Sequence, residues 1–148
     1  MTDEAPATKT VHAGCVAIGG RGVLIAGRPG SGKSDLALRL IDRGAVLVSD
    51  DYTLVIRSDG RLVASAPPTI AGQMEIRGVG LVEMEAAGEV PLCLLVDLDR
   101  APDRLPDEGE RAALAGLELP MIGLGALEAS APIKVEYALR NFGLHLRP

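Results

Sequence analysis

A glycine-rich segment near the N-terminus has the residue types that bind phosphate. It fills every fixed position of the pattern G-x-x-x-x-G-K-[ST] and consists of Gly27, Arg28, Pro29, Gly30, Ser31, Gly32, Lys33 and Ser34. The glycines let backbone N–H groups converge on phosphate oxygens, and a helix that follows would present its positive N-terminal end to the same anion. Lys33 would contact the β- and γ-phosphates, and Ser34 would offer a hydroxyl to Mg²⁺. The segment predicts a nucleotide-binding loop; the alternative is a glycine turn within a sheet.

Phosphoryl transfer also needs a metal ligand and, for a hydroxyl acceptor, a base, so acidic residues at strand ends are the next candidates. Asp50 and Asp51 follow a short β-branched run. If the strand continued through both, only one could point at the γ-phosphate, because successive strand residues face opposite sides. The other would support the metal shell or a loop. Asp97, at the end of another apolar run, is a competing acid. The alternative interpretation of Asp50 and Asp51 is a pair of solvated aspartates that form a turn.

Three more side chains are candidates on weaker grounds. Glu75 and Arg77 are two residues apart in a strand-like segment, so we expect them to share a face, where one could hold Mg²⁺ and the other a phosphate oxygen. On spacing alone, an exposed ion pair is the favoured interpretation of these two. His12, near the start of a strand, is by itself more typical of a structural histidine than of a catalytic one.

The elements that would position these residues are strands and helices in alternation around the loop. The pattern predicts a hairpin of Val11–Ile18 and Val23–Ala26, a helix over Ser34–Arg43 and a strand over Ala45–Val48. This order is typical of a right-handed crossover, which would bring the strand-end acids near the phosphate loop. The later segments predict a hairpin of Tyr52–Ile56 and Arg61–Ser65, a strand-like stretch over Met74–Val82, a buried strand over Val90–Val96, an exposed connection over 99–110, a strand over Leu117–Ile122 and a helix from Pro132 to about Asn141.

Length and composition limit the function further. The chain has 148 residues and 47% apolar side chains, which predicts a flexible tail over residues 1–10 and a single domain over residues 11–148. A net charge of -5, with two tyrosines and one phenylalanine, offers neither a basic track nor a stacking surface for nucleic acid. No apolar run approaches the ~20 residues that span a bilayer and no export signal is visible, so we expect a cytoplasmic protein without membrane contact. Cys15 and Cys93 lack a metal-motif spacing and are expected to be buried thiols.

In order along the chain, these motifs resemble the catalytic domain of bacterial HPr kinase/phosphorylase, in the short form found in alphaproteobacteria. The resemblance covers about His12 to Arg140. Its most specific element is Glu-Ile-Arg-Gly-Val-Gly after a double Asp, because phosphate loops alone are widespread. The matching segments are His12–Gly14, Gly27–Ser34, Leu47–Asp51, Glu75–Gly80 and Asp103–Leu105.

The resemblance implies a fold, cofactors and a partner. The fold is α/β, a phosphate-loop kinase core of the phosphoenolpyruvate carboxykinase-like type, with a mixed sheet, hairpins, one helix after the phosphate loop and a C-terminal helix. The implied cofactors are ATP and Mg²⁺, and the implied acceptor is a serine of HPr, a phosphocarrier protein of the bacterial phosphotransferase system. The family is usually a hexamer, so a homo-oligomer is expected here.

The resemblance also assigns roles to residues. Lys33 would bind the transferring phosphates, Ser34 and Glu75 would hold the divalent metal, and Asp51 would accept the proton of the HPr serine. His12 and Arg104 match two further positions associated with catalysis, where Arg104 would neutralise phosphate charge. Asp50 and Arg77 are expected to be supporting residues.

The resemblance implies a reverse reaction as well. Inorganic phosphate would attack phosphoserine to give pyrophosphate, with protonated Asp51 donating to the leaving serine. Many members carry a basic stretch before the last helix that is linked to this dephosphorylation, whereas residues 128–134 here hold Lys134 as their one cation. The sequence therefore supports the kinase reaction more strongly than the phosphorylase reaction.

Three rival functions share the phosphate loop. A small-molecule kinase usually has an arginine-rich lid, but residues 99–111 hold only three arginines among many acids. A GTPase needs an Asn-Lys-x-Asp or Thr-Lys-x-Asp segment, which the sequence lacks. A non-catalytic nucleotide sensor would have no need of Asp50, Asp51 and Glu75. We predict an ATP- and Mg²⁺-dependent serine kinase for HPr, with the small-molecule kinase and the sensor as alternatives.

Overall fold

The computed structural model describes residues 7–104 and 110–146. The first six residues of the predicted tail, and positions 105–109 of the predicted connection, lie outside the described residues. The described elements, in chain order, are β1 (Thr8–Val11), β2 (Ala13–Ile18), β3 (Arg21–Ala26), α1 (Lys33–Asp42), β4 (Val46–Ser49), β5 (Thr53–Ser58), β6 (Arg61–Ser65), β7 (Gln73–Ile76), β8 (Gly80–Glu83), β9 (Val90–Asp97), β10 (Glu110–Leu114), β11 (Leu117–Gly123) and α2 (Ala131–Phe142).

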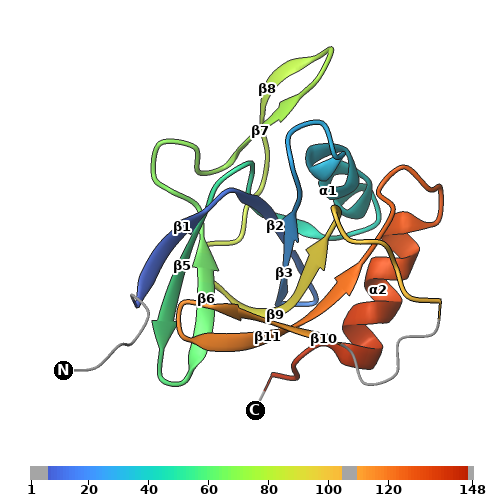
Figure 1. The fold of residues 1–148 in the computed structure, drawn as a ribbon. Coiled ribbons are helices and arrows are strands. Elements are labelled where there is room, and N and C mark those ends of the chain that lie inside the picture. The colour runs from blue at the N-terminus through green and yellow to red at the C-terminus, as the bar shows by residue number, and fades with distance from the viewer. Residues whose placement is uncertain (1–6, 105–109, 147–148) are drawn as a thin grey trace.

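A mixed, curled sheet of nine strands forms the body of the molecule (Figure 1). Its main path runs β1-β5-β6-β9-β3-β2-β4, and β11 joins through β9 and carries β10 on its other side. The β3–β9 and β9–β11 pairs are parallel, whereas the other pairs of this sheet are antiparallel. The phosphate-loop strand β3 is therefore an inner strand, and the predicted mixed sheet with hairpins is confirmed.

Two tight turns explain the hairpins that were expected from the sequence. Gly19 and Gly20, between β2 and β3, have φ of +58° and +80°, and Asp59 and Gly60, between β5 and β6, have φ of +51° and +76°. Positive φ at both central residues is the turn geometry that matches the twist of paired strands. Glycine and aspartate tolerate that conformation, so the local sequence dictates both turns.

Both helices cover one face of the sheet, on the right of Figure 1. Helix α1 buries Leu36, Ala37 and Leu40 against the sheet, and α2 buries Val135 and Leu139 beside them. An Arg43–Glu136 pair links the two helices, with guanidinium Nε 2.9 Å and Nη2 2.8 Å from the two carboxylate oxygens. The two predicted helices are confirmed within one residue at their starts and ends.

The other face of the sheet is covered by the sheet itself as it curls. Val23 and Ile25 of β3 belong to the cluster under the helices, while the intervening Leu24 belongs to a second cluster with Val55 and Leu119. Strand residues alternate between faces, so β3 is buried on both sides by two different sets of partners. Both cysteines are buried free thiols, Cys93 in the first cluster and Cys15 in the second, as expected.

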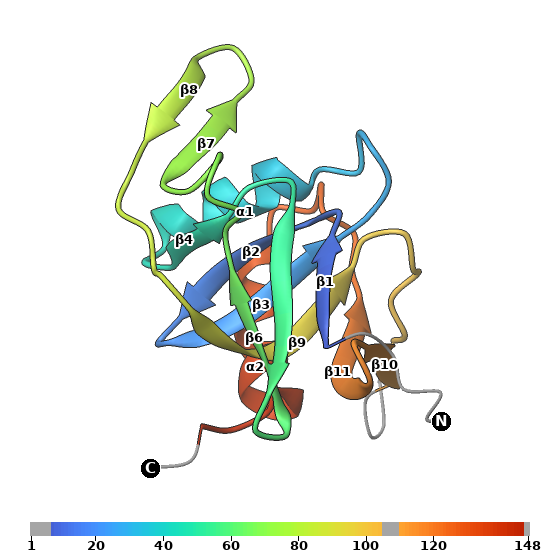
Figure 2. The same cartoon turned by 90° about the vertical axis from the view of Figure 1, so that its left-hand side faces the viewer.

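Two predictions about local structure were wrong, and one strand was not predicted. Thr8–Val11 forms strand β1, paired antiparallel with β5, so residues 8–10 are not a loose tail. Met74–Val82 is not one strand-like stretch but the hairpin β7–β8, which projects from the body in both views (Figure 2). Strand β10 was not predicted, and it overlaps the connection expected over residues 99–110 only at Glu110. In each case pairing with a distant or reversed strand organises a sequence that has weak local preference.

Within the described residues, neither helix has the length and apolar character that crossing a bilayer requires.

Candidate active site

The glycine-rich loop runs from the end of β3 to the first turn of α1, as its pattern requires. Gly30 and Gly32 have φ of +81° and +97°, conformations that side-chain-bearing residues rarely adopt. A Cβ on Gly27 would lie 2.5 Å from Ser31 Oγ, so the loop closes too tightly there for any other residue. Such a loop, with backbone N–H groups at the start of a helix, is a phosphate-binding geometry.

Lys33 is buried at the base of this loop. Its ammonium group donates to the carbonyl oxygen of Gly27 at 2.6 Å and to that of Arg28 at 3.3 Å. The same loop is closed by the amide of Ser31, which donates to Arg28 O at 3.0 Å. The loop is therefore held in part by contacts among its own residues, and the Lys33 ammonium group lies against two of its carbonyl oxygens.

Asp99, which was not among the predicted site residues, contacts the loop from outside. The backbone N–H of Arg28 donates to Asp99 Oδ2 at 2.9 Å, and the Arg28 guanidinium lies 3.5 Å from the other oxygen. The Asp99 amide in turn donates to Asp97 Oδ1 at 2.9 Å. Asp97, the competing acid, thus organises the turn that carries Asp99. The signal in the sequence was an Asp-x-Asp at the end of a buried strand.

Asp50 joins three parts of the site. Its Oδ1 accepts a hydrogen bond from the Ser34 hydroxyl at 3.1 Å, and its Oδ2 accepts one from the backbone N–H of Glu75 at 2.9 Å. The phosphate loop, the end of β4 and the β7–β8 hairpin therefore meet at this carboxylate. The predicted closeness of Asp50, Ser34 and Glu75 is found in the structure.

These oxygen-bearing side chains suit Mg²⁺, which takes few protein ligands beside water and substrate phosphates. Among the described residues, no group of three or more His, Cys, Asp or Glu side chains is arranged as a metal site by itself. The Ser34 hydroxyl, the exposed Glu75 carboxylate and the Asp50 carboxylate are oxygen donors of this kind. A Mg²⁺ ion that also binds nucleotide phosphates needs only a few such ligands from the protein.

Asp51 follows Asp50 after the end of β4 and contacts a different side chain, His12. His12 Nε2 is 3.0 Å from Asp51 Oδ1. Asp51 has φ of +67°, and the N–H of Tyr52 donates to Asp50 O at 2.7 Å across it, which is a γ-turn. Strand β4 ends at Ser49, so Asp50 and Asp51 lie outside it. The expectation that consecutive strand residues point to opposite faces therefore does not apply to these two aspartates. The turn, rather than a strand, sends the two carboxylates to different partners.

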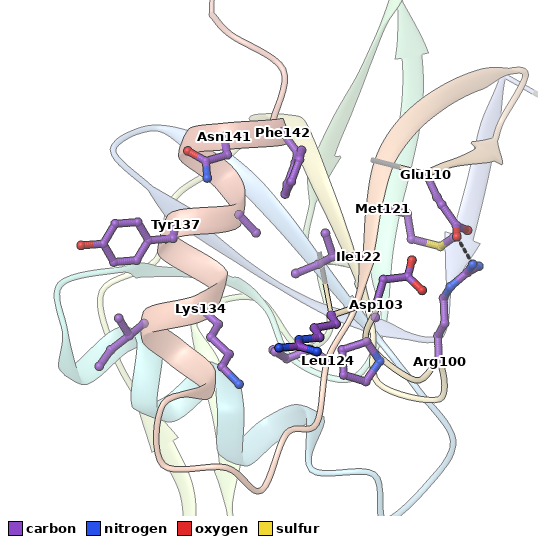
Figure 3. Close-up of a pocket in the computed structure, with 15 residues that line it drawn as sticks. Arg100, Asp103, Glu110, Met121, Ile122, Leu124, Lys134, Tyr137, Asn141 and Phe142 are labelled. Carbon is purple, nitrogen blue, oxygen red and sulfur yellow. Dashed lines mark hydrogen bonds and ion pairs between the residues drawn. The ribbon is translucent and has the colours of Figure 1, made fainter. Parts of the chain in front are cut away.

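Arg77 and Arg104 are not brought into this cluster. Arg77 is exposed in the turn after β7, so the expectation that it shares a strand face with Glu75 was wrong. Arg104 lines a cavity of about 430 Å³ between α2, the end of β11 and residues 100–104. Figure 3 shows Ile122, Lys134 and Phe142 around that cavity.

Several charged side chains at this cavity are already in ion pairs. Arg100 contacts Glu110 and Lys134 contacts Glu128. Among the described residues, no part of the phosphate loop lines the cavity. Lys134, the one cation expected near the start of α2, is paired with the carboxylate of Glu128, six residues earlier.

The sheet, the loop and the strand-end acids define an α/β protein of the phosphate-loop class. The family model described as HPr Serine kinase C-terminal domain matches residues 4–145. The chain belongs to this family.

Known proteins give the same result. The chain is 37% identical over 151 residues to the HPr kinase/phosphorylase of Geobacillus thermodenitrificans, a match covering 93% of this chain and 49% of that protein. It is 36% identical to the HPr kinase/phosphorylase of Burkholderia lata, with 93% of this chain and 47% of that protein covered. The chain thus spans about half the length of the curated relatives it matches.

A solved structure is also similar. The Hpr(Ser) kinase/phosphatase from Coxiella burnetii matches with a TM-score of 0.79 and 28% sequence identity, covering 90% of this chain and 89% of that one. The similarity confirms the fold class expected from the sequence.

Proposed function

We propose that this chain is a single ATP-binding kinase catalytic domain that transfers the γ-phosphoryl group of ATP to a serine of HPr. The observation that carries the proposal is the meeting of the phosphate loop, the Ser34–Asp50–Glu75 contacts and the Asp51–His12 contact at adjacent strand ends. The names of the relatives, HPr kinase/phosphorylase, support HPr as the acceptor.

The loop binds and orients the triphosphate. Lys33 exchanges its contacts with Gly27 O and Arg28 O for phosphate oxygens, and N–H groups at the start of α1 face the same charge. Ser34 and Glu75 would hold Mg²⁺. Asp50 accepts hydrogen bonds from the Ser34 hydroxyl and from the backbone N–H of Glu75, so it holds these two segments next to each other. Bound there, the metal would supply positive charge beside the phosphates.

Asp51 takes the proton of the acceptor serine. Its second oxygen, Oδ2, is the one not engaged by His12, and the carboxylate is half exposed, so a protein substrate can reach it. A base within hydrogen-bond distance of the attacking hydroxyl accelerates transfer by about 10²–10⁴. In the reverse direction the protonated Asp51 donates to the leaving serine while inorganic phosphate takes the phosphoryl group to give pyrophosphate.

Several exposed apolar residues support assembly of several copies. On α2, Ile133 and Tyr137 are exposed, and on the β7–β8 hairpin Val79 and Leu81 are 74% and 73% exposed. Contiguous exposed apolar patches mark protein–protein interaction sites, and Ile133 and Tyr137 are neighbours on one helix face. We propose a homo-oligomer, a hexamer by the family resemblance, working in the cytoplasm; light scattering on the purified chain tests the copy number.

The function is tested by incubating the purified chain with Mg-ATP and purified HPr. We expect HPr to gain the mass of one phosphoryl group on a serine, and added inorganic phosphate to remove it with formation of pyrophosphate. The Lys33→Ala variant is the control for a contaminating kinase. Binding of ATP without transfer to HPr from the same organism would contradict the proposal and favour a nucleotide sensor or a small-molecule kinase.

A further inference from the structure

The imidazole of His12 is held on two sides by consecutive residues. Its Nε2 lies 3.0 Å from Asp51 Oδ1, and its ring stacks on the Tyr52 ring with centroids 4.8 Å apart and planes inclined by 18°. The His12 and Asp51 side chains are 44% and 55% exposed. A contact between two groups as exposed as these contributes little ordering by itself, so the stacked ring is the larger constraint on the imidazole.

The backbone presents Tyr52 to His12 through strand pairing. In the β1–β5 ladder Val11 lies opposite Thr53, so the next residues of the two strands, His12 and Tyr52, face each other. The Thr53 hydroxyl donates to Ala13 O at 2.7 Å in a buried position, which fixes both chains just beyond the pair. The two rings therefore start from backbones with little freedom to separate.

The backbone of Tyr52 is also held by hydrogen bonds at its N–H and its carbonyl group. Its N–H closes the turn at Asp51 by donating to Asp50 O, and its carbonyl accepts a hydrogen bond from the Ser49 hydroxyl. The Asp51 conformation, with φ of +67°, costs free energy that the surrounding contacts must offset. The turn thus places the carboxylate at the edge of the imidazole and the phenol ring against its face.

We propose that Tyr52 is a positioning residue, whose ring holds the His12 imidazole so that its Nε2 keeps the Asp51 carboxylate in the orientation needed for proton transfer. This inference rests on the proposed function of Asp51. With the proton on Nε2, the imidazole donates to Oδ1 and leaves Oδ2 to accept the proton of the attacking hydroxyl. Without the ring the imidazole turns about its side-chain bonds and the carboxylate rotates with it.

The contact is made by ring faces, so the tyrosine hydroxyl is dispensable. Tyr52→Phe should keep kcat within about twofold of the wild type, whereas Tyr52→Ala should lower kcat about tenfold with the KM for ATP unchanged, since small misplacements of a reacting group are costly. In a His12→Ala background, Tyr52→Ala should have no further effect, because a residue that acts through His12 has nothing left to position.

Proton NMR gives a readout that does not depend on activity. The chain has two histidines, His12 and His145, so their ring signals are assigned with a single His145→Gln variant. Stacking on a tyrosine should shift the His12 ring protons upfield in the wild type and in Tyr52→Phe. In Tyr52→Ala these signals should move to the position of an unstacked imidazole, while those of His145 stay in place as the internal control.

The two measurements separate the possible failures. The proposal is overturned if the His12 signals are the same in the wild type and Tyr52→Ala, if kcat is unchanged when they do move, or if Tyr52→Ala still lowers kcat about tenfold in the His12→Ala background. A wild-type chain that fails to phosphorylate HPr contradicts the proposed function instead, and in that case the NMR comparison alone still decides whether Tyr52 fixes His12.

Discussion

The phosphate loop and the His12–Asp51 pair lie at neighbouring strand ends, but the chain builds them in different ways. The loop is one contiguous segment, closed by contacts between residues a few positions apart such as Lys33 to Gly27. The pair joins residues 39 positions apart, and a ladder between β1 and β5 brings them together. Apart from the contact of Arg28 with Asp99, the loop is therefore encoded by its own sequence, while the pair depends on the pairing of distant strands. This difference predicts that binding and transfer can be disrupted separately.

Asp51→Asn gives the largest expected separation. The amide cannot take the serine proton, so we expect transfer to HPr to fall by about 10²–10⁴ in kcat while ATP binding stays within about twofold. Asparagine also tolerates positive φ, so the turn should survive the change. Rates are measured by HPr phosphorylation and binding by calorimetry with ATP. Turnover equal to the wild type would rule out Asp51 as the base.

Lys33→Ala should affect both properties, because the ammonium group is part of the loop itself. We expect kcat to fall by about 10²–10³, the usual loss for one group that stabilises charge in the transition state, together with weaker ATP binding. The same two assays apply. If ATP affinity were retained, the loop would bind phosphate through its backbone alone and Lys33 would serve only the transfer step.

A matched pair of proline variants tests the role of the β1–β5 ladder. The amide of Arg57 donates to Ala7 O at 2.7 Å, and hydrogen-bonded pairs alternate along an antiparallel ladder. The N–H of Lys9 therefore faces β5, whereas that of Thr8 faces away. Lys9→Pro should remove a ladder hydrogen bond, loosen His12 and lower kcat about tenfold with ATP binding unchanged.

Thr8→Pro is the control for that experiment, because proline is tolerated in an edge strand where its N–H would face away from the neighbour. We expect kcat within about twofold of the wild type. Equal kcat values for the two variants would show that β1 does not position His12.

The smallest effect concerns the strand beneath the turn. Cys15 of β2 pairs with Ser49, directly before the Asp50–Tyr52 turn, and its burial raises the pKa of its thiol far above the usual range. Burial also raises the pKa of Cys93. The folded chain keeps these protons where the unfolded chain loses them, so the free energy of unfolding should be unaffected below about pH 8.5 and fall as pH rises above it.

Thiol reactivity measures the same property. We expect dithiobis(nitrobenzoate) to react with neither cysteine of the native chain at pH 8 and with both in urea. In the Lys9→Pro variant, both cysteines should remain equally unreactive if the structural change is confined to β1. Fast reaction of Cys15 in that variant would mean that the loss extends into β2, and its kinetics would then report unfolding.

Local signals were enough to predict the loop and much of the fold. The glycines of residues 27–34, the Asp59–Gly60 turn and the apolar face of Ser34–Arg43 each determine structure within a few residues. What could not be predicted depends on partners far along the chain. Residues 8–10 are polar and have no period, and they form part of strand β1 because β5 offers them hydrogen bonds.

The candidate site also has parts that the sequence predicts and parts that depend on contacts outside the local sequence. The sequence placed Asp50 and Asp51 at the right strand end, but their separate partners depend on the γ-turn, which no residue type there demands. Arg77 was misplaced because a Gly-Val-Gly segment permits a hairpin turn as readily as a strand. Asp99 and Tyr52 were missed because each acts through a neighbour, Asp99 by a backbone N–H of the loop and Tyr52 by a ring face.

The parallel pairing of β3 with β9 also sets the order in which the protein can form during synthesis. The β2–β3 hairpin and the phosphate loop leave the ribosome before β9, and the parallel neighbour of β3 is complete only when Asp97 has been added. Until then the nascent chain exposes the unpaired edge of an apolar strand, the kind of surface that invites wrong pairing between chains. Slowing translation before residue 90 should therefore increase aggregation of the nascent protein, and a chaperone that covers strand edges should be needed most in that interval.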